Sequence, residues 1–83
     1  MNEYLKRVLV FLRQELPIIY RESTVIVDEK FIVYLSDAVD FGKVYEELFN
    51  KITANINRVR VREFDLEFTI KSPNQERDFR ILK

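Results

Sequence analysis

The chain has 83 residues, its 14 basic and 14 acidic side chains give a formal net charge of zero, and it contains no histidine, no cysteine and one glycine, Gly42. This composition excludes Ser-His and Cys-His nucleophiles, zinc sites built on nitrogen or sulfur, and glycine-rich phosphate-binding loops. We therefore expect a protein that is not an enzyme and that holds no metal and no cofactor.

The length predicts one small domain over residues 1–83. Such a domain is only marginally stable alone, because small domains bury a smaller fraction of their surface than large ones. The apolar run at residues 8–12 is too short to span a membrane and is flanked by charged residues in a helical pattern. We therefore expect a soluble, cytoplasmic protein without a membrane partner.

A helix is predicted at the start of the chain, over residues 2–16. One helical face is formed by Leu5, Val8, Leu9, Leu12 and Leu16. Pro17 ends this helix because it lacks an amide hydrogen and restricts the residue before it. Tyr4 and Phe11 lie on the shoulder of the apolar stripe, where we expect them to be available to a protein partner.

A β-hairpin is predicted next, with strands at residues 24–27 and 31–35. A three-residue loop at 28–30 would pair Val27 with Phe31 and direct both side chains to the helices. The apolar residues on the opposite face of the sheet would then be adjacent, and they are Ile26, Ile32 and Tyr34. A contiguous exposed patch favours a protein interface, unless residues 18–20 or the C-terminus cover it.

A second helix is predicted to begin at Ser36 or Asp37, which are both good N-caps. It should end near Asn57 in a left-handed conformation. Its apolar residues recur at helical spacing and are Phe41, Val44, Tyr45, Leu48, Ile52 and Ile56.

The segment at residues 58–71 alternates between apolar and charged residues, but the phase of the alternation changes at Arg62 and Glu63. A β-bulge in one long strand or a two-residue turn would return all the apolar residues to one face, and we favour the bulge because these two residues suit a tight turn poorly. A turn at 72–75 then leads to a last strand at 77–82. Pairing Lys71 with Glu76 also sets Phe68 against Phe79, Leu66 against Ile81 and Glu67 against Arg80.

The element order αββαββ predicts an α+β fold of two layers. A four-stranded, mostly antiparallel sheet should carry both helices on one face. Folds of this kind serve many unrelated roles, so the architecture alone does not indicate a function.

Basic residues gather in the last third of the chain. Arg58, Arg60 and Arg62 would share one face of the long strand, with Arg77 and Arg80 nearby, and could contact a phosphate backbone. The acids that follow on that face, Glu63, Asp65 and Glu67, would repel phosphate, and their spacing is loose for one metal ion. Any binding of nucleic acid should therefore be weak and independent of sequence.

These observations favour a non-catalytic protein-interaction module that acts as an adaptor, regulator or inhibitor of a larger protein. We expect it to form a homodimer that buries part of the open sheet face or pairs edge strands, because a domain this small gains stability by burying one face. The alternative is a weak nucleic-acid-binding protein that uses the arginine strand.

Overall fold

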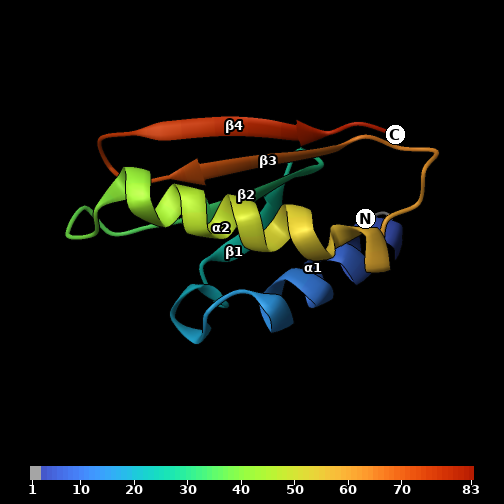
Figure 1. Cartoon of the computed structure of the whole chain (residues 1–83), viewed down its shortest axis with the longest axis horizontal. Coiled ribbons are helices and arrows are strands. Elements are labelled where there is room, and N and C mark those ends of the chain that lie inside the picture. The colour runs from blue at the N-terminus through green and yellow to red at the C-terminus, as the bar shows by residue number, and fades with distance from the viewer. Residues whose placement is uncertain (1–2) are drawn as a thin grey trace.

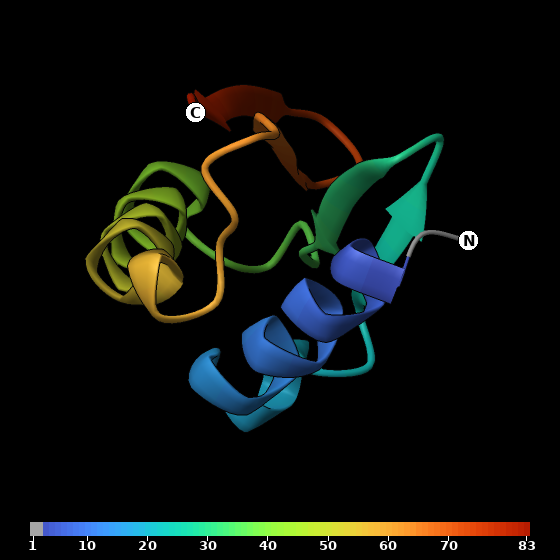
Figure 2. The same ribbon diagram turned by 90° about the vertical axis from the view of Figure 1, so that its right-hand side faces the viewer.

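Two helices lie on one face of a four-stranded sheet, in the order αββαββ that the sequence predicts (Figure 1). The computed structural model describes residues 3–83. Figure 2, turned by 90°, shows both helices on the same side of the strands. The elements in chain order are α1 (Glu3–Glu15), the short 3-10 helix η1 (Ile18–Tyr20), β1 (Thr24–Val27), β2 (Lys30–Tyr34), α2 (Phe41–Asn55), the 3-10 helix η2 (Ile56–Arg58), β3 (Leu66–Lys71) and β4 (Glu76–Ile81). The α+β fold class is confirmed.

The strands lie side by side in chain order, β1-β2-β3-β4. The pairs β1/β2 and β3/β4 are antiparallel, whereas β2 and β3 are parallel. A parallel pair needs a long crossover connection, and α2 provides it. The mostly antiparallel sheet is therefore confirmed.

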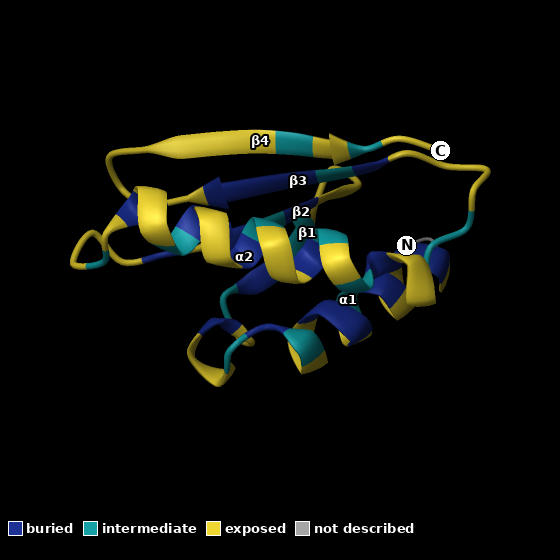
Figure 3. Cartoon of the chain, in the orientation of Figure 1, coloured by how far each residue is buried: buried dark blue, intermediate teal, exposed yellow. Residues whose placement is uncertain are grey.

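Aromatic rings form the centre of the core. Phe31, Phe68 and Phe79 stack across three adjacent strands, with ring centroids 5.3 Å and 4.8 Å apart. Phe49 of α2 meets the Phe79 ring edge-on at 4.9 Å. Figure 3 shows the outcome for the sheet, in which β3 is mostly buried and β4 is largely exposed.

The first hairpin has a shorter loop than the sequence analysis predicts. Residues 28–29 form a two-residue loop with φ of 51° and 65°. Positive φ at both positions belongs to the type I′ turn, whose twist matches that of the paired strands. Val27 therefore pairs with Lys30. This shift of one residue turns Ile26 towards the core and Val25 to the opposite face, so the predicted register is wrong.

The second helix begins later than predicted and ends differently. Its N-cap is Asp40, whose Oδ1 accepts a hydrogen bond from the Lys43 amide at 3.3 Å. The predicted cap Ser36 instead accepts from the Ala38 amide, in a local turn ahead of the helix. Among the described residues other than glycine, only residues 28 and 29 have a positive φ. Asn57 is therefore not left-handed, and the predicted helix stop is wrong.

The predicted long strand at residues 58–71 forms only in its second half, so this prediction is wrong for its first half. Arg58 belongs to η2, residues 59–65 form no strand, and a turn brings the Phe64 amide to 3.4 Å from the Val61 carbonyl. Neither the bulge nor the two-residue hairpin is present. The Val61 amide donates to the Tyr4 hydroxyl at 2.9 Å, which ties this segment to α1 instead of to a neighbouring strand.

The second hairpin follows the predicted register. The pairs Leu66 with Ile81, Glu67 with Arg80, Phe68 with Phe79 and Lys71 with Glu76 are all present. The Ser72 amide donates to the Gln75 carbonyl at 2.8 Å and closes the turn.

Candidate functional site

The face of the sheet that points away from the helices, here called the open face, is the candidate site. Side chains alternate between the two faces of a strand, so the register places every second residue of each strand on the open face. These residues form three rows across the strands. The first row is Val27, Lys30, Glu67 and Arg80, the central row is Val25, Ile32, Thr69 and Asp78, and the third row is Tyr34, Lys71 and Glu76.

The half of the open face on β1 and β2 is apolar except for Lys30 at its edge, and we call its apolar residues the apolar patch. It consists of Val25, Val27, Ile32 and Tyr34. Val27 is 44% exposed and Tyr34 is 45% exposed, whereas Val25 and Ile32 are half-buried. Of the interface residues that the sequence analysis selects, the structure brings Ile32 and Tyr34 together. Ile26 packs against the core instead, and the two valines that the altered register exposes take its place.

The half of the open face on β3 and β4 is charged, and its first and central rows are paired within the chain. Arg80 and Glu67 form an ion pair of 2.7 Å, and the Thr69 hydroxyl donates to the Asp78 carboxylate at 2.7 Å. A small hollow of about 100 Å³ lies over the first and central rows of these strands, with Lys30 at its margin. The charged side chains of the first and central rows are therefore held in place beside the apolar patch.

Tyr4 and Phe11, which the sequence analysis places at an interface, lie in the core. They are 6% and 7% exposed. The apolar face of α1 is wider than its central leucine stripe, so residues on the shoulder of the stripe also pack into the core. Their expected exposure is therefore wrong.

The arginines expected on one strand are spread over different elements, and most have partners within the chain. Arg58 pairs with Glu15 at 3.2 Å, and Arg60 donates to the Leu82 carbonyl at 2.8 Å. The guanidinium of Arg77 lies 4.3 Å from the centre of the Tyr45 ring, and Arg80 is held by Glu67 as described above. Arg62 is exposed in the turn before β3. The continuous basic stripe is absent because the strand that would carry it is absent.

The three acids considered as metal ligands are likewise not aligned on a strand. Glu63 and Asp65 precede β3, and the Asp65 carboxylate accepts from the Lys83 amide at 2.8 Å. Within residues 3–83 no group of three or more acidic side chains could hold a metal ion. In the same part of the chain no helix is long and apolar enough to cross a membrane.

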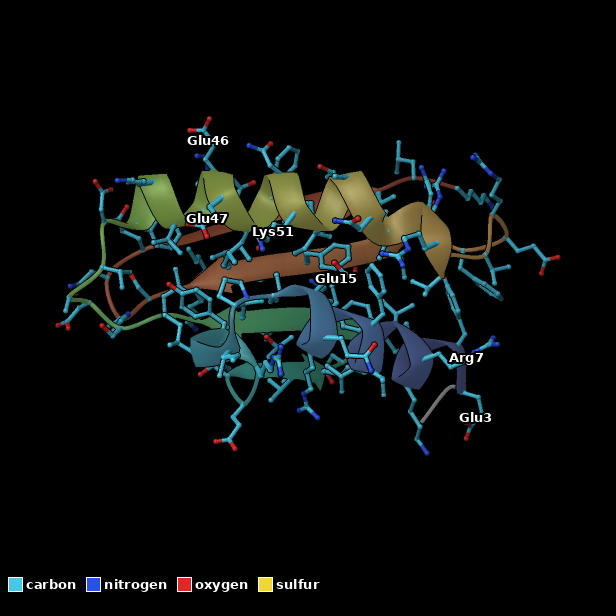
Figure 4. The ribbon with its side chains drawn as sticks, turned by 60° about the horizontal axis from the view of Figure 1, so that its bottom comes forward. Glu3, Arg7, Glu15, Glu46, Glu47 and Lys51 are labelled. Atoms are coloured by element: carbon cyan, nitrogen blue, oxygen red, sulfur yellow. The ribbon has the colours of Figure 1, made fainter. Side chains whose placement is uncertain are left out.

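The helix side of the molecule differs from the open face in its chemistry. Figure 4 shows Glu15 of α1 and Glu47 and Lys51 of α2 lying between the two helices, while Glu46 points away from them. Burial raises the pKa of Tyr20 above its ordinary value of 10.0, and the Glu47 carboxylate raises it further. The surface between the helices is therefore charged, whereas the open face presents apolar side chains on β1 and β2.

A second exposed apolar group includes residues 18–19, which the sequence analysis treats only as a possible cover for the open face. Ile18 and Ile19 of η1 are 74% and 72% exposed. Val10 on the outer side of α1 is 56% exposed and lines a hollow of about 420 Å³ with Arg13 and Arg21. The signal in the sequence is the Ile-Ile pair after Pro17, which a short turn presents to solvent.

Comparison with protein-family models finds no match, and comparisons with curated proteins and with solved structures find no significant match either. Function is therefore argued from the chemistry of the surface.

Proposed function

We propose that this protein is a non-catalytic interaction module that self-associates through the apolar patch of its open face and serves a larger protein as an adaptor, regulator or inhibitor. The observation that supports the proposal is the adjacency of Val25, Val27, Ile32 and Tyr34 on a sheet face that no helix within residues 3–83 covers. A contiguous apolar surface bordered by charged residues is typical of a protein-binding site.

The charged half of the open face supports the same proposal. A polar rim beside an apolar centre is the usual arrangement of a protein interface, since the rim fixes orientation while the centre supplies affinity. The paired side chains Arg80 with Glu67 and Thr69 with Asp78 lose little freedom when a partner binds, because they are already held in one geometry.

Binding of nucleic acid is the weaker alternative. Neutralising phosphates requires arginines that are free to reach them, and Arg58, Arg60 and Arg80 already contact groups within the chain. No second observation favours a nucleic-acid interface.

Size-exclusion chromatography with light scattering tests the proposal, with and without mixed oligonucleotides. We expect a dimer at micromolar protein concentration whose mass does not change when oligonucleotides are added at physiological salt. A protein that is monomeric over the whole concentration range would contradict self-association. A monomer that binds oligonucleotides at physiological salt would favour the alternative.

A further inference from the structure

The charges on the open face follow a pattern that is inverted between its two ends. In the first row, β3 carries the acid Glu67 and β4 the base Arg80. In the third row, β3 carries the base Lys71 and β4 the acid Glu76. Each strand of the charged half thus has opposite signs at its two ends, so the face can complement a reversed copy of itself.

We propose that the open face binds a second copy of this chain, packed face to face about a two-fold axis that runs across the strands at the central row. The proposal rests on the self-association proposed above and specifies its geometry. In an isologous dimer the same surface patch is used by both subunits, so the patch must complement itself under the rotation.

Only one of the two in-plane axes gives this complementarity. An axis parallel to the strands would lay β1 of one copy on β4 of the other and bury Val27 against a charged side chain. An axis across the strands lays each strand on its own counterpart, running in the opposite direction. The apolar patch then meets an apolar patch, and the first row of one copy meets the third row of the other.

The contacts that follow in the charged half are attractive. Glu67 faces Lys71 of the second copy, and Arg80 faces its Glu76. In the apolar half Lys30 faces the ring of Tyr34, which suits a cation over an aromatic face. The rotation generates each of these contacts twice.

The central row lies on the axis, where each residue meets its own copy. Ile32 packs on Ile32 and Val25 on Val25, so the centre of the interface is apolar. Two twisted sheets pack about 10 Å apart with their strands within about 30° of one another, so the correspondence is closest near the axis. Asp78 on Asp78 is the one like-charged contact in this arrangement.

Two double variants test the register while keeping each reversed β3/β4 pair oppositely charged. Glu67→Arg with Arg80→Glu reverses the first row, and Lys71→Glu with Glu76→Lys reverses the third row. Each variant keeps the net charge and the opposite signs of the β3/β4 pair that it reverses. Glu67→Arg also places a base beside Lys30 of β2, so the third-row variant, whose β2 neighbour is the uncharged Tyr34, is the cleaner of the two. In the proposed dimer of either variant with itself, however, all four charged contacts between the copies become repulsive.

We expect each double variant to self-associate at least about 100-fold more weakly than wild type, because opposed like charges are strongly unfavourable at an interface. An equimolar mixture of the two should form a heterodimer with an affinity within about tenfold of the wild-type homodimer, because all four contacts are then attractive again. Sedimentation equilibrium measures the affinities, and circular dichroism checks that each variant is folded. A chain carrying both reversals should self-associate as wild type does, and it replaces the mixture if either double variant unfolds.

The outcomes separate the two proposals. A wild-type protein that stays monomeric contradicts self-association and with it this geometry. A wild-type dimer whose double variants still self-associate, or whose variants fail to pair when mixed, overturns the register and leaves self-association standing.

Discussion

Replacing Ile32 by aspartate is the most direct test of the apolar patch. Ile32 lies in the central row, next to Val25 on β1 and Thr69 on β3, and it is half-buried in the monomer. The proposed self-association would bury the rest of this side chain, and a two-fold dimer would contain two copies of it. The substitution therefore changes the free energy of association through two side chains, but the free energy of folding of each monomer through one.

The expected magnitude follows from that burial. Complete burial of an isoleucine side chain is worth about 1.5 to 3 kcal/mol, so the exposed part of a half-buried one is worth about 1 kcal/mol. Two copies give about 2 kcal/mol, and an unpaired carboxylate removed from water adds about 1 to 3 kcal/mol or more for each copy. The sum is at least about 4 kcal/mol, a weakening of about 1000-fold. The monomer loses about 1 kcal/mol through the lower strand propensity of aspartate.

Sedimentation equilibrium and thermal unfolding distinguish the two effects. We expect Ile32→Asp to be monomeric at concentrations where wild type is dimeric, with an unchanged circular dichroism spectrum. Val10→Asp is the matched control, because Val10 is 56% exposed on α1, on the other side of the sheet. The reasoning is refuted if Ile32→Asp dimerises with wild-type affinity, or if Val10→Asp weakens the dimer equally.

Three further substitutions test other parts of the structure. Tyr4→Phe removes the acceptor of the Val61 amide, so we expect the free energy of unfolding in urea to fall by about 1 to 3 kcal/mol; no change would show that this bond does not hold the segment. The raised pKa of Tyr20 means that the folded state keeps this proton longer than the unfolded chain, so its contribution to stability is present below about pH 10 and is lost as the pH rises through the folded pKa. Tyr20→Phe should therefore lose less stability than wild type when urea titrations at pH 9 and 11 are compared. Asp78→Asn removes the like-charged contact on the proposed axis, worth about 1 to 3 kcal/mol at about 5 Å. It should tighten the dimer about fivefold or more by sedimentation equilibrium; weaker association would argue against that axis.

The second hairpin is predictable because two separate patterns select one register. The apolar pair Phe68 with Phe79 and the charged pair Glu67 with Arg80 both require the same alignment, and a shift of one residue would break both. The helices are predictable for a similar reason, since their apolar residues keep one period over several turns.

The segment at residues 59–65 is not predictable from alternation alone. Arg58 to Val61 alternates as a strand does, but a strand needs a neighbour with free backbone groups. The Val61 amide is satisfied by the Tyr4 hydroxyl, 57 positions away in the sequence. A contact at such a separation leaves no local signal in the sequence. Because the strand is absent, the prediction that Arg58, Arg60 and Arg62 share one strand face is also wrong.

The length of one loop determines which residues make up the candidate site. Non-glycine residues with positive φ are uncommon, so an Asp-Glu pair gives only a weak signal for a two-residue turn. Yet that turn places Ile26 against the core and Val25 on the open face, so a charge introduced at Ile26 would disturb folding and imitate a loss of association. The same turn sets Lys30 at the start of β2, in the first row beside Glu67. The proposed two-fold axis would bring it over Tyr34 of the second copy. The self-complementary pattern of the open face therefore depends on the shorter loop, and substitutions at Ile32 and in the charged rows are informative because they leave that loop and the core unchanged.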